Sequence, residues 1–263
     1  MRSLYKDKLH KEVFGLGDPV VMLHGWAMHT GVWRDFARQL AANRQVICLD
    51  LPGHGLSGNV QPYTLESVVD AVVGELPEQA CDIVGWSLGG NVALRLAEKY
   101  PQRIKSLVLI ASNPHFIKTK SWPGVDPQVL KEFANNLQKN CASTLLRFMS
   151  LQLQAKPDVK ASLKQIKMAM QECAAPEPVV LMAGLSVLQA ADQIKALSSI
   201  NIPVLMILGE QDTLVPVSVG GHCQLLPVQI DLKIIAGAGH IPFITDQKQV
   251  LSFMQDFMLR SDG

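Results

Sequence analysis

The sequence lacks several features that would point to other classes of protein. No apolar run approaches the roughly 18 residues that a membrane-spanning helix needs. The N-terminal stretch MRSLYKDKLHKEVFG has no apolar core long enough for a signal peptide. The five cysteines are scattered, odd in number and without a C-x-x-C pair, which argues against a disulfide framework and against a zinc site. We therefore expect a protein of the cytoplasm.

Charge is also scarce. Charged residues make up 18% of the chain and hydrophobic residues 48%, a composition typical of a well-packed globule rather than a disordered chain. The formal net charge is only +1, so nothing in the overall balance favours a nucleic-acid binder. We find no internal repeat and no low-complexity tract. At 263 residues, the chain can form one large domain, with or without an insertion.

Short apolar runs alternate with helical patterns along most of the chain. Each run is rich in Val, Ile and Leu and ends in glycine or a polar turn, as buried strands do. The runs cover residues 19–25, 45–53, 81–87, 104–112, 202–210 and 231–240. Helix-like spacing is found at residues 31–40, 65–76 and 91–100. This alternation predicts an α/β fold, with a mostly parallel sheet covered by helices on both faces.

The alternation stops between residues 113 and 190. Residues 131–152 and 158–173 have helical patterns, and no convincing strand lies among them. We interpret this segment as a helical lid inserted into one domain, whose core is formed by residues 1–112 and 191–263.

A serine stands at a sharp corner between a predicted strand and a predicted helix. Gly85-Trp86-Ser87-Leu88-Gly89 matches the G-x-S-x-G nucleophile elbow, with a strand before it and a helix after it. Glycines are needed because side chains two residues either side of the serine would collide with backbone in so tight a turn. The alternative is a glycine-rich turn whose serine only caps the helix. We predict that Ser87 is a nucleophile.

A serine hydroxyl needs a base, and the base needs an orienting carboxylate. In this type of fold they follow the serine in the order acid, then histidine. His240 follows the last predicted strand, and Asp212 follows the strand before it. Glu210 and Asp50 are rival acids, but Glu210 lies nearer the strand and Asp50 precedes the serine. We predict a triad of Ser87, Asp212 and His240.

The negative oxygen that forms during acyl transfer needs hydrogen-bond donors. The residue after the nucleophile, Leu88, supplies one backbone N–H, and a loop after an early strand supplies the other. That loop is LHGWAMH, in which Trp26 is the natural second donor. His24 precedes the serine, so we interpret it as a structural residue that supports this loop. His54 has the same structural interpretation.

These motifs together resemble a known family. LHGW, DLPGHGLS, GWSLGG, GEQDTLVP and AGHIPF are similar to α/β-hydrolase motifs, in the same order and over nearly the full length. The tryptophans of HGWAMH and GWSLGG, with the segments ASNPHF, SWPGVDPQVL and RFMSLQ, resemble the pimeloyl-[acyl-carrier protein] methyl ester esterases. That resemblance implies an α/β-hydrolase fold, an esterase of biotin synthesis, no metal or organic cofactor, and the same triad. It also implies substrate contacts at Trp26, Ser87, Leu88, Phe148, Met149, Ser150, Leu151, Gln152 and His240.

The resemblance further implies an acyl-carrier protein as partner, held by basic lid residues. Arg147 matches one family arginine, Lys160 and Lys164 stand at two other basic positions, and Ser143 replaces a basic residue. The predicted lid has nine Lys or Arg and five Asp or Glu, so it carries +4 while the rest carries −3. Lys160, Lys164 and Lys167 follow one helical stripe, which fits either docking of an acidic carrier or an ordinary solvated face.

Three other functions remain open from the sequence. The first is a broad-specificity esterase of short free esters, with the same triad and no carrier. The second is a C–C bond hydrolase or lyase, which differs in its pocket rather than in its motifs. The third is a non-catalytic binding protein on the same fold, against which the intact triad argues. We expect a monomer that binds neither nucleic acid nor membrane.

Overall fold

The computed structural model describes residues 8–152 and 159–261, except for the side chains of residues 149, 151, 152, 159–161 and 163. Its centre is a seven-stranded sheet in the order β1-β3-β2-β4-β5-β6-β7. The strands are β1 (Lys11–Phe14), β2 (Pro19–Leu23), β3 (Gln45–Leu49), β4 (Cys81–Trp86), β5 (Ile104–Ile110), β6 (Val204–Gly209) and β7 (Ile230–Ile235). All neighbouring strands are parallel except β1 and β3. The predicted α/β fold and its six strands are confirmed, and β1 was not predicted. The strand before His240, β7, was predicted as buried, but it lies at the edge of the sheet and is only partly buried.

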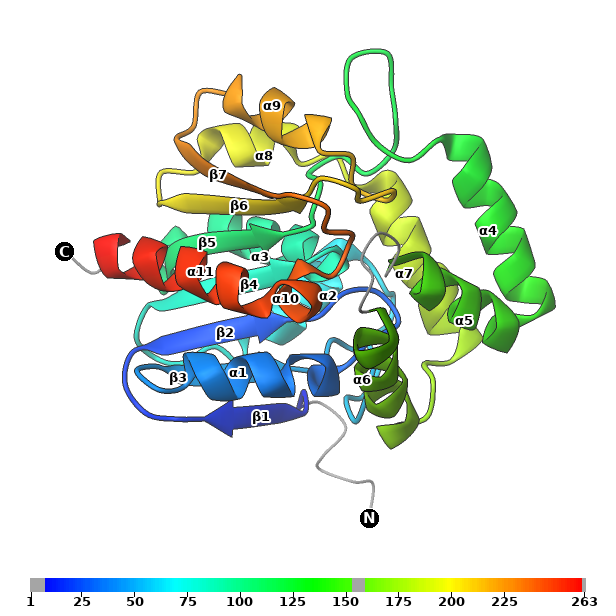
Figure 1. Cartoon of the computed structure of the whole chain (residues 1–263), viewed down its shortest axis with the longest axis horizontal. Helices are drawn as coiled ribbons and strands as arrows, with labels where there is room; N and C mark the ends of the chain where they lie inside the picture. Colours follow the sequence, from blue (N-terminus) through cyan, green and yellow to red (C-terminus); the bar gives the residue numbers. More distant parts are fainter. Residues whose placement is uncertain (1–7, 153–158, 262–263) are drawn as a thin grey trace.

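Helices cover both faces of the sheet, as Figure 1 shows. Helices α1 and α11 pack against each other on one face, while α2, α3 and α8 lie together on the other. The bounds of these helices are Arg34–Leu40 for α1, Leu65–Val73 for α2, Leu88–Lys99 for α3, Ile194–Ser199 for α8 and Gln247–Ser261 for α11. Every residue of β2, β4 and β6 is buried. This burial explains why these strands are continuously apolar rather than alternating.

Smaller elements lie in the connections between the strands and the larger helices. They are the 3-10 helices η1 (Thr30–Trp33) and η2 (Pro101–Arg103), together with the short helices α9 (Ser218–Gln224) and α10 (Pro242–Thr245). Helix η1 follows the loop after β2, and α10 follows the loop after β7. Both loops therefore lie at the carboxyl edge of the parallel strands, where α/β folds place their sites.

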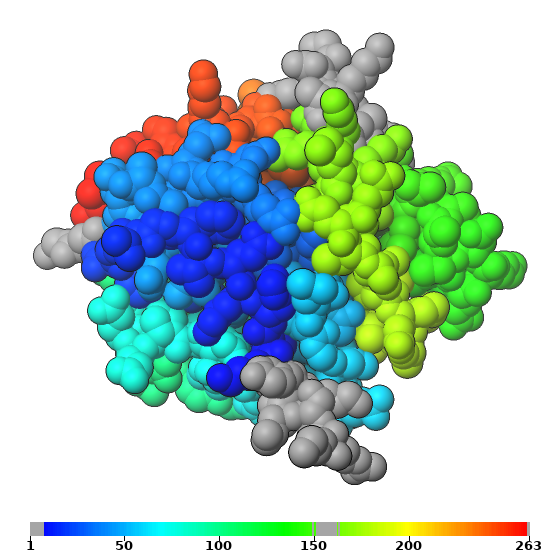
Figure 2. All heavy atoms as spheres, turned by 90° about the horizontal axis from the view of Figure 1, so that it is seen from below, coloured from blue at the N-terminus to red at the C-terminus, as the bar shows by residue number. Residues whose placement is uncertain are grey.

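The segment between residues 113 and 190, which we call the lid, forms helices at one end of the sheet (Figures 1 and 2). They are α4 (Pro127–Lys139), α5 (Cys141–Gln152), α6 (Val159–Glu172) and α7 (Pro178–Ala190). The single helical pattern that we predicted over residues 131–152 is divided between α4 and α5. Asn140 separates them, because its side chain accepts a hydrogen bond from Ser143 N–H at 3.2 Å and caps the new helix.

The two ends of the lid lie side by side. The backbone N–H of Gln193 donates to the carbonyl of Pro114 at 2.9 Å, and His115 forms an isolated β-bridge with Asp192. A segment that leaves and returns at one point can be inserted without disturbing the sheet. On this basis we propose the division of the chain into a core and an inserted lid.

The turn from β4 into α3 depends on close backbone packing. Ser87 lies in the left-handed region with φ of 54°, which is uncommon for a residue with a side chain. A Cβ at Gly85 would lie 2.4 Å from the carbonyl oxygen of Gly89. A Cβ at Gly89 would lie 2.4 Å from the carbonyl oxygen of Leu23 at the end of β2. The glycines therefore allow the first turn of α3 to lie against the neighbouring strand.

This packing predicts that Gly89→Ala destabilises the protein. Because the new methyl group would contact main-chain atoms that cannot rotate away, we expect a loss of about 2 kcal/mol or more in the free energy of unfolding. The matched control is Gly221→Ala in α9, where a Cβ would meet no atom within 4 Å. That variant should be neutral or more stable by up to about 1 kcal/mol. Urea denaturation measures both, and equal stabilities would contradict the packing argument.

Candidate active site

Ser87 is held at the elbow by hydrogen bonds to its own backbone. Its N–H donates to the carbonyl of Ile110 at 3.0 Å. Its carbonyl accepts from Gly90 N–H at 2.9 Å and from the Ser112 hydroxyl at 3.1 Å. The residue as a whole is only 9% exposed. These contacts fix a strained backbone at the nucleophile.

His240 and Asp212 lie together, as the sequence predicts. His240 Nδ1 is 2.7 Å from Asp212 Oδ2, and the two side chains are 2% and 0% exposed. The other carboxylate oxygen, Oδ1, accepts from the backbone N–H groups of Leu214 at 2.8 Å and Val215 at 2.9 Å. These bonds keep the acid oriented and acting as an acceptor. The imidazole proton therefore lies on Nδ1, which leaves Nε2 able to take a proton.

Trp86 brings the loop of His240 beside the elbow. Its indole N–H donates to the carbonyl of His240 at 2.8 Å. Its ring lies 5.8 Å from the imidazole ring, centroid to centroid. Because Trp86 directly precedes Ser87, this contact places the histidine and the serine in one neighbourhood. Ser87, Asp212 and His240 thus come from the ends of β4, β6 and β7.

The two rival acids bind backbone groups elsewhere. The Glu210 carboxylate accepts from Gly237 N–H at 2.8 Å. The Asp50 carboxylate accepts from Thr30 N–H at 2.6 Å and from Leu56 N–H at 2.9 Å. Both acids shape loops at the edge of the sheet, and Asp212 is the acid in contact with His240.

The loop of residues 24–29, which we call the oxyanion loop, lies against the elbow. A turn closed by Met28 N–H and the Gly25 carbonyl at 3.2 Å carries Ala27 at φ of 62°. A Cβ at Gly25 would lie 3.0 Å from the Trp86 ring, so the loop packs on the residue next to the serine. Leu88 is the first residue of α3, where a backbone N–H has no partner within the helix. Trp26 and Leu88 are therefore the candidate donors.

His24 and His54 are buried partners in the frame of this loop. Their rings lie 5.3 Å apart, and both residues are 0% exposed. His24 Nε2 accepts from Leu51 N–H at 2.9 Å, while Nδ1 donates to the Gly25 carbonyl at 2.8 Å. Burial lowers the pKa of each imidazole to about 3. A group with so low a pKa is a poor base at neutral pH, which agrees with a structural role.

The side chain of Trp26 points into the lid. Its indole N–H donates to the Leu181 carbonyl of α7 at 2.9 Å. Its ring packs edge-on against Phe133 of α4, with centroids 5.6 Å apart, and against Phe148 of α5, with centroids 5.2 Å apart. The sequence predicted a role for Trp26 and Phe148. Phe133 was not predicted, because the sequence shows only that it is an aromatic residue within the lid.

A pocket of about 540 Å³ lies between α4 and α5, beside this aromatic cluster. Phe133 and Phe148 line it together with the basic residues Lys139 and Arg147. Arg147 was predicted as a carrier contact, whereas Lys139 was not. Lys164 is exposed on α6. Ser150 is also exposed, and its hydroxyl donates to the Leu146 carbonyl of its own helix at 3.0 Å. The side chains of Met149, Leu151, Gln152 and Lys160 lie outside the described part of the structure.

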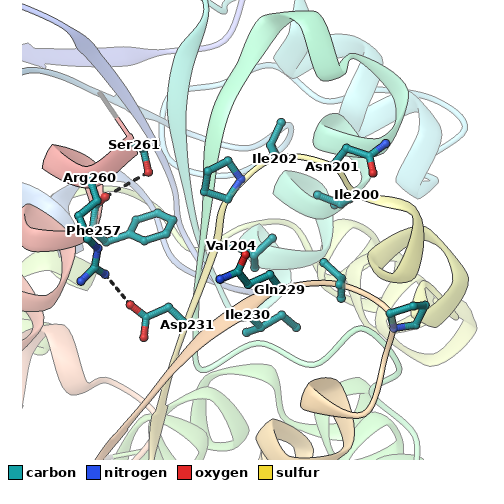
Figure 3. A pocket seen from close by; sticks show the side chains of 13 residues that line it. Ile200, Asn201, Ile202, Val204, Gln229, Ile230, Asp231, Phe257, Arg260 and Ser261 are labelled. Atoms are coloured by element: carbon teal, nitrogen blue, oxygen red, sulfur yellow. Dashed lines mark hydrogen bonds and ion pairs between the residues drawn. The ribbon is translucent and has the colours of Figure 1, made fainter. Parts of the chain in front are cut away.

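A second cavity, of about 700 Å³, lies at the opposite edge of the sheet (Figure 3). It is lined by the beginnings of β6 and β7 and by the end of α11, where Arg260 pairs with Asp231 at 2.6 Å. Reaction sites in parallel sheets form at the carboxyl ends of the strands instead. Volume alone therefore does not identify the site.

Within residues 8–152 and 159–261, no three His, Cys, Asp or Glu side chains form a group suited to a metal ion. No helix of the part described is long and apolar enough to cross a membrane.

Comparison with known proteins agrees with this geometry. Residues 18–247 match the family described as alpha/beta hydrolase fold. The pimeloyl-[acyl-carrier protein] methyl ester esterase of Vibrio parahaemolyticus is 35% identical, over 95% of this chain and 97% of its own. The same esterase of Nitrosomonas europaea is 36% identical, over 93% of this chain and 97% of its own.

Solved structures show the same fold at lower identity. A bromoperoxidase from Bacillus anthracis superposes with a TM-score of 0.86 at 24% identity, covering 95% of both chains. An esterase from Exiguobacterium antarcticum gives 0.85 at 19% identity, covering 95% of this chain and 94% of its own. The chain therefore belongs to the α/β-hydrolase family and, within it, to the group of pimeloyl-[acyl-carrier protein] methyl ester esterases.

Proposed function

We propose that this protein hydrolyses the methyl ester of pimeloyl-[acyl-carrier protein] to methanol and the free carboxylate, a step of biotin synthesis. The observation that carries the chemistry is the 2.7 Å contact of His240 with Asp212 beside the strained elbow of Ser87. The names of relatives that are 35% and 36% identical over nearly the whole chain support the substrate.

The reaction proceeds in two acyl-transfer steps. His240 Nε2 removes the proton of the Ser87 hydroxyl, which attacks the ester carbonyl. Asp212 holds the imidazole and stabilises its positive charge. Methanol leaves with the proton from His240 and gives an acyl-serine. Water, deprotonated by the same histidine, then attacks the acyl-serine and releases the carboxylate.

The Trp26 and Leu88 amides stabilise both tetrahedral intermediates. Each N–H would donate to the negative oxygen that forms from the ester carbonyl. Loss of one such donor typically costs about 3–4 kcal/mol of transition-state stabilisation. Leu88 N–H also lies at the positive end of the α3 dipole, which favours negative charge at that position.

The lid provides the surfaces that we propose bind the substrate. The aromatic cluster of Trp26, Phe133 and Phe148 forms an apolar wall that runs from the oxyanion loop to the pocket of α4 and α5, which Phe133 and Phe148 line. An acyl chain can lie along such a wall, while Lys139 and Arg147 outweigh the single carboxylate of Glu132 and leave the pocket lining net positive. We propose that the acidic carrier docks on the basic lid and that the protein acts as a cytoplasmic monomer.

The direct test compares two substrates. We expect kcat/KM for pimeloyl-carrier methyl ester to exceed that for free dimethyl pimelate by at least about tenfold, a difference of about 1.4 kcal/mol. Ser87→Ala should lose several orders of magnitude on both, because triad residues act as a unit. Equal kcat/KM values for the two substrates would favour the broad-specificity esterase. Substantial turnover by Ser87→Ala would reject the nucleophile.

The acid of the triad is tested by a matched pair. Asp212→Asn should keep the protein folded but misorient the imidazole, lowering kcat by about 10⁴-fold as in other triads. Glu210→Gln should change kcat little, because Glu210 binds the backbone of Gly237. Steady-state kinetics on a chromogenic ester measure both. A larger loss of kcat in Glu210→Gln than in Asp212→Asn would identify Glu210 as the acid of the triad.

The carrier contact is tested by charge reversal. Replacing Arg147, Lys160 and Lys164 by Glu should lower kcat/KM only for the carrier-linked ester, because these charges attract the acidic carrier and a small free ester carries no charge for them to attract. With exposed pairs worth up to about 1 kcal/mol each, we expect a loss of one to two orders of magnitude at low salt. The loss should shrink at 1 M salt, where the Debye length falls to about 3 Å.

The control reverses three exposed lysines outside the lid, Lys8, Lys195 and Lys248, with the same change in net charge. This variant should keep its activity on both esters. Equal losses from the lid triple and the control triple would show that only net charge matters. No loss from the lid triple would remove these residues from the carrier contact.

A further inference from the structure

The oxyanion loop is held between two helices of the lid. On one side, the Trp26 indole N–H donates to the Leu181 carbonyl of α7 at 2.9 Å. On the other side, His29 Nε2 lies 2.6 Å from the Ala169 carbonyl oxygen of α6. Both contacts are buried, and both join residues more than a hundred positions apart in sequence. The candidate oxyanion donor, Trp26 N–H, belongs to the residue that makes the first attachment and is three residues from His29, which makes the second.

The hydrogen bonds of His29 define its tautomer. Its Nδ1 accepts from the backbone N–H of Gly31 at 3.1 Å and caps η1. A backbone N–H can only donate, so the ring proton is on Nε2 and is directed at Ala169. The Ala169 carbonyl belongs to the last turn of α6, where carbonyls have no partner within the helix. One neutral imidazole therefore links the oxyanion loop to the end of a lid helix.

The surrounding residues leave little freedom at this contact. His29 is 6% exposed. A Cβ at Gly31 would lie 2.6 Å from His29 Cε1 and 3.1 Å from Glu172 Oε2, so the glycine is needed for the close approach. Glu172, three residues after Ala169, forms an ion pair with Arg34 of α1. Figure 2 shows the yellow-green part of the lid lying against the blue N-terminal part of the core.

We propose that His29 is a positioning residue for ester hydrolysis, which sets the oxyanion loop relative to lid helix α6. The proposal rests on the proposed function, because it assigns Trp26 N–H to the oxyanion. His29 is three residues from that N–H, across a turn that contains the left-handed Ala27. Release of its bond to α6 would let the loop shift. A shift of about 1 Å at a reacting group can cost about 10²-fold in rate.

Two substitutions test the hydrogen bonds of the two ring nitrogens of His29 separately. Asn places its side-chain amide near the position of Nδ1, and Asn is a favoured N-cap, so His29→Asn keeps the bond from Gly31 and loses the bond to Ala169. Gln reaches the position of Nε2, so His29→Gln restores a donor to Ala169. We expect His29→Asn to lower kcat on p-nitrophenyl butyrate by about tenfold with KM changed less than about twofold. His29→Gln should recover kcat to within about threefold of the unsubstituted protein.

A trifluoromethyl ketone gives a second readout. It forms a tetrahedral adduct with a serine nucleophile, and the oxyanion of the adduct occupies the oxyanion hole. The inhibition constant should rise in His29→Asn by the same factor as kcat falls, because both report the same hydrogen bond. A purely structural role would lower the melting temperature without changing this constant.

The control is Gln165→Ala. Gln165 also joins α6 to the core, through a 3.3 Å hydrogen bond to Asp35, which belongs to α1 and not to the oxyanion loop. Its removal should leave kcat unchanged. Normal kcat in His29→Asn would overturn the proposal, and so would an equal fall in kcat for Gln165→Ala. Turnover of p-nitrophenyl butyrate by the unsubstituted protein tests the esterase separately, because the His29 result is a ratio between variants.

Discussion

The candidate site depends on the packing of one indole, that of Trp86. The residue is 2% exposed and directly precedes Ser87. The Gly25 turn of the oxyanion loop packs on one part of its ring, and its N–H binds the backbone of His240. Its other neighbours are Phe243 and Trp33, with centroids 5.1 Å and 6.3 Å away. A rigid, large side chain thus holds the nucleophile, base and oxyanion loop at fixed relative positions, as preorganised catalysis requires.

The glycines of the elbow complement this large side chain. Trp86 occupies one side of the turn, and the first turn of α3 must then approach β2 closely on the other. A methyl group at Gly89 would lie 2.4 Å from a β2 carbonyl, and one at Gly90 would lie 2.2 Å from the Ser112 hydroxyl. The glycines of GWSLGG therefore permit close packing beside the large Trp86 side chain, at a turn where Ser87 has a positive φ.

Local patterns predicted much of this architecture. Runs rich in Val, Ile and Leu end at the loops of Ser87, Asp212 and His240, so strand ends and triad order could be predicted together. The last of these runs, β7, was recognisable although Asp231 and Lys233 interrupt it. Strand β1 was missed because it has four residues, lies at the edge and has an alternating burial pattern that gives no apolar run. Helix α7 was not singled out because it is apolar on most sides and carries little helical periodicity.

Other features of the site were not predictable, because they depend on contacts between distant residues. The pairing of His29 with Ala169 spans 140 positions and involves a backbone carbonyl, which has no sequence signature. The same holds for Trp26 and Leu181, which are 155 positions apart. In the sequence, Phe133 and Lys139 have no feature that distinguishes them from other helical residues. Their place beside the pocket follows only from the packing of α4 against α5.

The attachment of the oxyanion loop to the lid has a consequence for a substrate whose reacting ester is far from its carrier. Most of the binding energy of such a substrate comes from the acyl chain and the carrier, remote from the carbonyl that reacts. Binding energy raises kcat only where it improves interactions made in the transition state. The lid would contact the acyl chain and the carrier. It also holds the oxyanion loop, because Trp26 contacts α7 and His29 contacts α6. The lid thus links remote binding to the interactions made in the transition state. In the proposed reaction, contacts between the lid and the acyl chain of the substrate would therefore also stabilise the oxyanion loop.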